Sequence, residues 1–185
     1  MTDDTYTEAV LREQMNIHQT YYRTRLESCK RLGIKFRLPA IPEDISENVV
    51  KFIIHNHVGD RTSSWNCKGD LLSTKERKQE CKCFTSDGPI SFTPSSEWGI
   101  IYFLDARKWS SDKYTLYRVA LVRTSEEWKN IKVNKTHTFQ EQCSQGRRPR
   151  ITWKSLHPQI AEHCQVVYEG TFEGIFTPGV EIPIA

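Results

Sequence analysis

Two acidic residues and one lysine stand at a spacing that suits metal-assisted hydrolysis of a phosphodiester. Asp70 is followed, after nine intervening residues, by Glu80-Cys81-Lys82. Magnesium ions prefer oxygen ligands and usually take one or two carboxylates beside water and phosphate oxygens. A bound metal ion neutralises charge on the phosphate and lowers the pKa of an attacking water molecule. Asp70, Glu80 and the Cys81 backbone carbonyl are therefore candidate metal ligands, and Lys82 is a candidate to hold the water and the scissile phosphate.

A pair of strands must position these groups. The pattern predicts a short strand at 70–72, a turn at 73–76 and a second strand at 78–84. Side chains alternate along a strand, so Glu80 and Lys82 are expected on one face and Cys81 and Cys83 on the other. A Glu-x-Lys tripeptide also arises on any solvated strand face, which remains the alternative interpretation of these residues alone.

The remaining pattern predicts an α/β (α+β) domain with a mixed central sheet of about four or five strands flanked by helices. The apolar run 100–104 indicates a central strand buried on both faces, and 114–122 the next strand. A capping box at Thr5 predicts a helix at 5–32, and a second one at Thr124 predicts a short helix that ends at about 131. A last helix is expected at 155–164, and its regular part should begin near Pro158. The stripe around Ile45 and Val49 predicts a helix at 43–56. We expect one domain, 1–185, with a long N-terminal helix (5–32) and a catalytic core at 43–122.

Charge is concentrated in one segment. The chain has a net charge of +3, but residues 129–154 contain seven Lys or Arg residues and one Glu. Such a segment favours contact with an anionic partner, because cations supply affinity for phosphates and arginine can also bind guanine edges with two hydrogen bonds. A solvated basic loop is the alternative. The candidate nucleic-acid contacts are Lys135, Thr136, Gln142, Gln145, Arg147, Arg148 and Arg150.

Composition restricts the class of protein. An aromatic content of 11% in 185 residues argues for a folded domain, and no stretch of about 18 apolar residues predicts a membrane span. The acidic start Met1-Thr2-Asp3-Asp4 is not a secretory signal, so we expect a cytoplasmic protein whose six cysteines are reduced. The spacing of Cys81 and Cys83 is poor for zinc, which usually takes cysteines two to four residues apart.

The segment from Gly69-Asp70 to Glu80-Cys81-Lys82 resembles the Asp … Glu-x-Lys signature of the PD-(D/E)xK nuclease superfamily, with Gly69 where the signature usually has proline. Glu47 matches the glutamate that many members carry on a preceding helix, although an ordinary acid of a first helical turn is the alternative. The chain is further similar to small type II restriction endonucleases, in residues 85–92, 98–105, 130–136 and 145–150. The similarity covers about residues 40–157, and the nearest subgroup is the endonucleases that cut GCNGC-like sites.

This resemblance implies Mg²⁺-dependent cleavage of double-stranded DNA that leaves 5′-phosphates, with Asp70, Glu80 and Lys82 at the centre and Glu47 assisting. It also implies a homodimer on a two-fold symmetric site, and a cognate DNA methyltransferase as a genetic rather than physical partner. Two alternatives remain open from the sequence. One is a DNA repair or structure-specific nuclease of the same superfamily, and the other a non-catalytic DNA-binding module, with or without stabilising zinc.

Overall fold

The apolar strand β5 (Ile100–Lys108) forms the centre of the computed structural model, which describes residues 7–59, 64–65, 71–72 and 78–179. Ile100, Tyr102 and Leu104 pack into one layer, whereas Ile101 and Phe103 pack into the other. The expectation of a central strand buried on both faces is confirmed. Two cores therefore lie on the two sides of one sheet.

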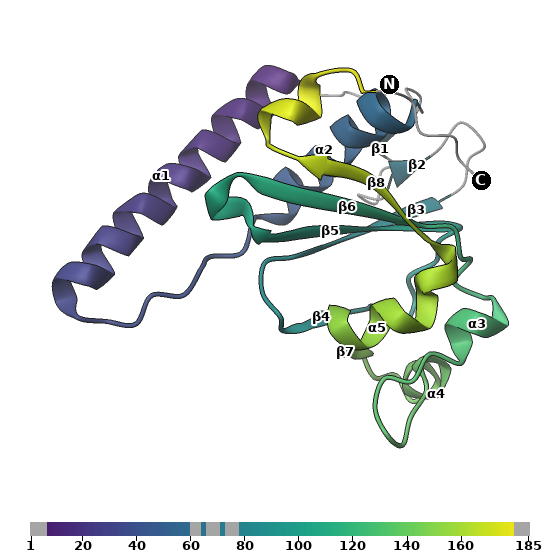
Figure 1. Cartoon of the computed structure of the whole chain (residues 1–185). Helices are drawn as coiled ribbons and strands as arrows, with labels where there is room; N and C mark the ends of the chain where they lie inside the picture. Colours follow the sequence, from purple (N-terminus) through teal and green to yellow (C-terminus); the bar gives the residue numbers. More distant parts are fainter. Residues whose placement is uncertain (1–6, 60–63, 66–70, 73–77, 180–185) are drawn as a thin grey trace.

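The sheet is mixed and six-stranded in the order β1-β2-β3-β5-β6-β8 (Figure 1). Strand β3 (Lys78–Phe84) is parallel to β5, and β6 (Lys113–Val119) is antiparallel to it. Strand β8 (Cys164–Gly170) adds to β6, whereas β1 (Ser64–Trp65) and β2 (Leu71–Leu72) continue beyond β3. The mixed sheet agrees with the prediction, although it has six strands among the described residues, two of which have only two residues. Strand β8 is more regular than expected, since the sequence pattern predicts a helix up to residue 164 and then strand fragments and irregular chain.

The first core lies between the sheet and helix α2 (Glu43–Ile53), which continues as a π-helix, Ile54–Val58. Ile45, Val49 and Ile53 of the predicted apolar stripe are buried against the sheet. Helix α1 (Glu8–Leu32) and a short 3₁₀ helix, Glu173–Phe176, cover this core from outside. Among the described residues, no helix is long and apolar enough to cross a membrane.

The second core lies on the opposite face and is built largely by an excursion of the chain, residues 120–163, between β6 and β8. The excursion closes where it begins, because the Ala120 N–H donates to the His163 carbonyl at 3.3 Å. The elements of the excursion are α3 (Glu126–Lys129), α4 (Phe139–Ser144), β7 (Arg150–Thr152), α5 (Trp153–Ile160) and a 3₁₀ turn, Ala161–His163. Strand β7 pairs with β4 (Pro89–Ser91) to form a separate two-stranded sheet.

Three local expectations about helix ends are wrong. The N-caps are Thr7 and Ser125 rather than Thr5 and Thr124, because Thr7 and Ser125 accept hydrogen bonds from the third residue after them. Helix α5 starts at Trp153, well before Pro158, because the Thr152 side chain caps it and Trp153, Leu156 and Ile160 bury one face. A proline is tolerated here because a short helix gives up only one backbone hydrogen bond to it.

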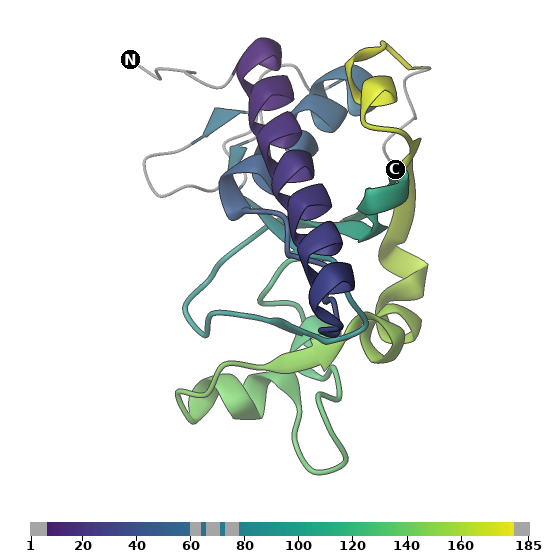
Figure 2. The same cartoon turned by 90° about the vertical axis from the view of Figure 1, so that its left-hand side faces the viewer.

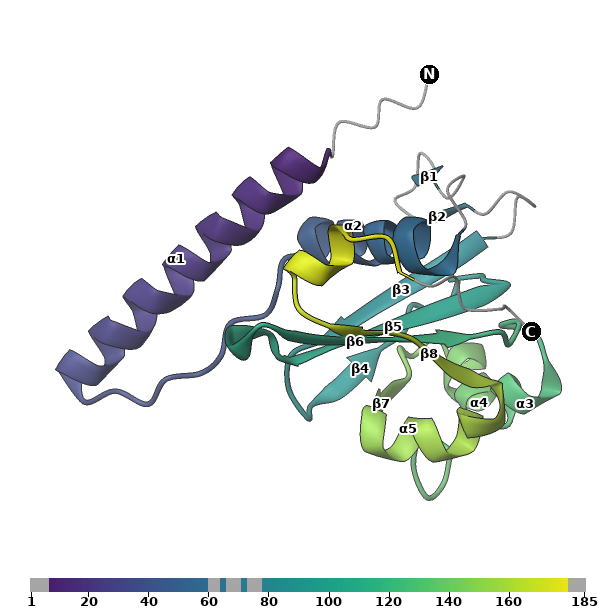
Figure 3. The same cartoon turned by 45° about the horizontal axis from the view of Figure 1, so that its top comes forward.

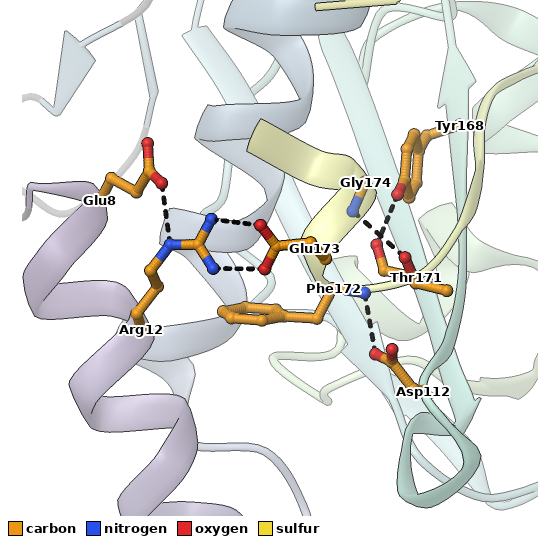
Figure 4. A network of polar contacts seen from close by, with 8 residues as sticks. All are labelled: Glu8, Arg12, Asp112, Tyr168, Thr171, Phe172, Glu173 and Gly174. Carbon is orange, nitrogen blue, oxygen red and sulfur yellow. Dashed lines mark hydrogen bonds and ion pairs between the residues drawn. The ribbon is translucent and has the colours of Figure 1, made fainter. Parts of the chain in front are cut away.

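Helix α1 is attached to the body mainly through its N-terminal half. Arg12 donates to both carboxylate oxygens of Glu173, at 2.5 and 2.9 Å, and to Glu8 at 2.8 Å (Figure 4). Farther along, His18 and Tyr22 contact the ring of Trp109, which belongs to the 3₁₀ turn Trp109–Ser111. His18 is thus a packed residue. Beyond these contacts the C-terminal turns of α1 stand away from the sheet (Figures 1 and 3).

Candidate active site

Glu80 and Lys82 lie on the same face of β3 and form an ion pair between the Lys82 ammonium and the Glu80 carboxylate. The predicted alternation is confirmed, since Cys81 and Cys83 pack against the first core on the other face. Only 6% of Glu80 is exposed. A buried carboxylate that stays ionised needs an opposite charge, and Lys82 supplies it. Burial of an unpaired Glu80 carboxylate would cost free energy, and the ion pair with Lys82 offsets this cost.

Among the described residues, the outer edge of β3 is open at this position, because β2 pairs with β3 only at Lys78 and Gln79. The Lys78 carbonyl accepts from Gly99 N–H at 2.9 Å and so points towards β5. Carbonyl directions alternate along a strand, so the Cys81 carbonyl points the other way, towards the open edge. The oxygen proposed from the sequence as a metal ligand is thus directed out of the sheet.

A cleft of about 520 Å³ borders this open edge. Helix α2 forms one wall, with Glu43, Ser46 and Glu47, and β3 forms another, with Lys82. Glu47 is the fifth residue of α2, whose first turn carries Glu43 and Asp44, so it is not a first-turn acid. The other lining residues are Ile41, Cys81, Cys83, Phe84, Thr85, Ser86, Gly88, Pro89, Ile90 and Ser91. The cleft thus joins a carboxylate from α2 with the lysine of β3.

The fourth predicted catalytic residue, Asp70, lies outside the described residues, so its pairing with Glu80 stays a prediction. Leu71, the next residue in the chain, is paired with Gln79, the residue before Glu80. The described residues near this position offer three oxygen donors, which are Glu80, Glu47 and the Cys81 carbonyl. These are hard ligands of the kind that magnesium prefers. The donor set therefore fits Mg²⁺ in its chemistry.

The cysteines of β3 pack, partly buried, against the first core. Burial raises the pKa of the Cys83 thiol to about 12. The pKa of the Cys81 thiol is also raised, first by burial and then by the nearby Cys83 and Glu47. Within the described part of the chain, no group of three or more His, Cys, Asp or Glu side chains is arranged to hold a metal ion.

The far wall of the cleft is a loop that Arg107 fixes to the sheet. Its guanidinium donates to Asp105 at 3.0 and 2.7 Å and to Asp87 at 2.5 Å. Asp87 lies between Ser86 and Gly88, which line the cleft. Sequence reasoning did not single out Arg107, and the alternation Asp105-Ala106-Arg107 at the end of the central strand is the signal that it offered.

The basic segment is connected to the cleft through the β4–β7 pair. Ser91, which lines the cleft, is the register partner of Arg150. Arg147 and Arg148 are exposed in the preceding loop, after Gly146, whose φ of +68° ends α4 in the left-handed region. The structure therefore brings Arg150 beside the cleft wall, whereas Arg147 and Arg148 extend away along the surface.

The other candidate contacts lie farther along the same excursion. Gln142 is on α4, Gln145 caps its C-terminus, and Lys135 is exposed in the turn before it. Thr136 has a local role, because both its N–H and its hydroxyl donate to the Asn134 side chain, at 2.9 and 3.0 Å. None of these four lines the cleft, and their contact with DNA stays a prediction.

Comparison with known proteins places these features in a family. The model of the Bsp6I restriction endonuclease family matches residues 10–160, which is most of the chain. The type II restriction enzyme Bsp6I from Bacillus sp. (strain RFL6) is 39% identical over 62 residues, and the alignment covers 34% of this chain and 34% of that enzyme. No solved structure matches the chain significantly. The chain belongs to the Bsp6I restriction endonuclease family.

Proposed function

We propose that this chain is a type II restriction endonuclease that hydrolyses phosphodiesters of double-stranded DNA at a specific sequence in a Mg²⁺-dependent reaction. The observation that carries the proposal is the buried Glu80–Lys82 ion pair on β3, at an edge that is open among the described residues, in a member of a restriction endonuclease family. Alternation of acid and lysine on a solvated face would leave Glu80 exposed, but only 6% of it is exposed.

In the proposed mechanism, Glu80, Asp70 and the Cys81 carbonyl hold the metal ion, as in the PD-(D/E)xK signature. The bound ion would neutralise charge on the phosphate and lower the pKa of a water molecule. Lys82, beside Glu80 on β3, would position the attacking water through its ammonium or, as the neutral amine, help to deprotonate it. Glu47 assists from the α2 wall of the same cleft. Attack of the water on phosphorus breaks the bond between phosphorus and the 3′-oxygen. The 3′-oxygen takes up a proton to become a hydroxyl, and the other product end carries a 5′-phosphate.

The substrate and assembly follow from the same family. We propose a homodimer of single nuclease domains, with the cognate methyltransferase as genetic partner, because one active site cuts one strand and two-fold symmetry of the protein matches a palindrome. Residues of the excursion 120–163, Arg150 foremost, would read the site, for which a GCNGC-like sequence is the proposal. Sequencing the ends of digested DNA tests both the site and the 5′-phosphates.

Substitution of the buried pair tests the catalytic assignment. Glu80→Gln and Lys82→Met should each lower cleavage by about 10²–10⁴-fold while binding to duplex DNA remains. Lys78→Met is the matched control, because Lys78 is on the same strand but at its exposed start, paired with Glu97 at 3.0 Å. Wild-type cleavage by Lys82→Met would sink the assignment. Cutting only at junctions or lesions, without discrete fragments from linear plasmid, would contradict the restriction function.

A further inference from the structure

A second basic surface lies at the C-terminal end of α1, apart from the segment 129–154. Residues 23–37 contain six Lys or Arg residues and a single acid, Glu27. All six cations are exposed, and none has an ion-pair partner in the part of the chain that the structure describes. The cations are Arg23, Arg25, Lys30, Arg31, Lys35 and Arg37.

Three of these cations converge because the connector after α1 folds back along the helix. The Ile34 N–H donates to the Cys29 carbonyl at 3.0 Å, Phe36 packs edge-on against Tyr22, and Trp109 donates to the Pro39 carbonyl. With Phe36 turned towards the helix, its neighbours Lys35 and Arg37 are left outside. They meet Arg25, which comes from the adjacent face of α1. Together these three cations line a hollow of about 280 Å³ with Tyr21 and Phe36.

Like charges gathered around one hollow repel one another, and a bound anion relieves this repulsion. The described residues that line the hollow include no acid, since Tyr21, Leu38, Phe36 and Pro39 complete it. The three remaining cations lie elsewhere on the helix, so the convergence is a property of this hollow and not of the helix as a whole. The ligand chemistry that fits is a phosphate group.

The hollow lies within reach of the cleft. Helix α1 runs from the β1–β2 end of the molecule to the β4–β7 end (Figures 1 and 2). From Arg37 the chain reaches the cleft-lining Ile41 in four residues, which span no more than roughly 14 Å. Duplex DNA carries one charge per about 1.7 Å of its axis, so a duplex at the cleft presents several phosphates over this distance.

We propose that the hollow formed by Arg25, Lys35 and Arg37 is a binding site for the DNA backbone, four residues along the chain from the cleft-lining Ile41. The site grips phosphates on the flank of the cut position and carries no sequence information. This inference rests on the proposed function only in taking duplex DNA as the ligand. Helix α1 then serves as an arm that holds the duplex against the cleft.

Equilibrium binding to a short mixed-sequence duplex, without added metal, tests the site in the full chain. The variant Arg25→Gln/Lys35→Gln/Arg37→Gln should bind at least ~10-fold more weakly, and the slope of log K against log salt should fall by up to roughly 2.7, about 0.9 per phosphate contact. The loss should be equal for duplexes with and without the recognition sequence. With Mg²⁺ and saturating DNA, the cleavage rate should remain that of the wild type.

The matched control is Arg23→Gln/Lys30→Gln/Arg31→Gln, which removes the same charge from exposed positions of α1 outside the hollow. It should keep the wild-type slope. An unchanged slope in the first variant, equal losses in both, or dissociation of the subunits as the cause of weaker binding would each overturn the proposal. Binding is measured without cleavage, so a wild-type protein that binds DNA but does not cut it would refute the proposed catalysis and leave this test intact.

Discussion

At the scale of single residues, the site combines a buried charge with its neutralising partner. Glu80 has only 6% of its surface exposed and contacts the Lys82 ammonium. In the proposed function, a metal ion held by Glu80 would leave the Lys82 ammonium available to a phosphate or a water molecule. The contact between the two side chains therefore places the proposed cation beside the proposed metal ligand.

Glu47 gives a prediction at this scale. It lines the same cleft as Lys82, from the second turn of α2. Glu47→Gln should lower cleavage by about 10–100-fold, as is usual for groups that support a metal site, and added Mg²⁺ should recover part of the loss. Glu43→Gln is the control, because Glu43 lines the cleft from the exposed first turn. Equal effects of both changes on the Mg²⁺ dependence of the rate would show that Glu47 has no special role.

At the scale of elements, the excursion 120–163 is anchored by aromatic side chains. Phe139 of α4 is fully buried and packs edge-on against Phe92 at 5.2 Å and Trp128 at 5.7 Å. Thr138 and Glu141 cap the same helix reciprocally. The short helix α4 is therefore stable through its packing, since six residues are too few for an isolated helix.

Phe139→Ala should lower the free energy of unfolding by about 3–5 kcal/mol, the usual cost of removing a buried phenyl ring. Urea unfolding measures this change directly. Gln140→Ala, on the exposed side of the same helix, should change it by less than about 0.5 kcal/mol. A small effect of Phe139→Ala would mean that the excursion is not anchored through this ring.

The sequence predicted some elements better than others for physical reasons. Strand β3 was placed at its observed bounds, because alternation of charged and apolar side chains is a local signal. Helix α4 was not predicted, because its few residues are mostly polar. The capping box Thr138–Glu141 is the sequence signal that indicates it. Strand β7 was missed because only its pairing with β4, about sixty residues earlier in the chain, makes it a strand.

Part of the candidate site was predicted from the sequence, and part of it was not. The placement of Glu80 and Lys82 on one face follows from strand alternation, and the structure shows it. Glu47 was proposed from the resemblance to the nuclease superfamily, and in the structure it lines one cleft together with Lys82. Arg107 and the cations of the α1 hollow were not predicted, since ion pairs to a loop and a connector folded back on a helix depend on tertiary packing.

At the scale of the whole molecule, the proposed dimer gives a sharp prediction. If each subunit cuts one strand, a mixed dimer of one wild-type and one Lys82→Met subunit should nick its site and leave the other strand intact. Co-expression with two affinity tags isolates the mixed dimer, and agarose gels distinguish nicked from linear plasmid. Linear product from the mixed dimer at the wild-type rate would contradict the proposed division of labour.

The hydrogen bond between Ala120 and His163 has a consequence for how the sequence can change in evolution. The excursion leaves the sheet and returns at one point, so its length is uncoupled from the order of strands on either side. Each doubling of such a loop costs only about 0.6 kcal/mol of chain entropy. Insertions and deletions in its exposed turns are therefore cheap, while the hairpin that carries Glu80 and Lys82 is untouched. If this part of the chain reads the DNA site as proposed, changes in the recognised sequence can accumulate here at little risk to the proposed hydrolysis.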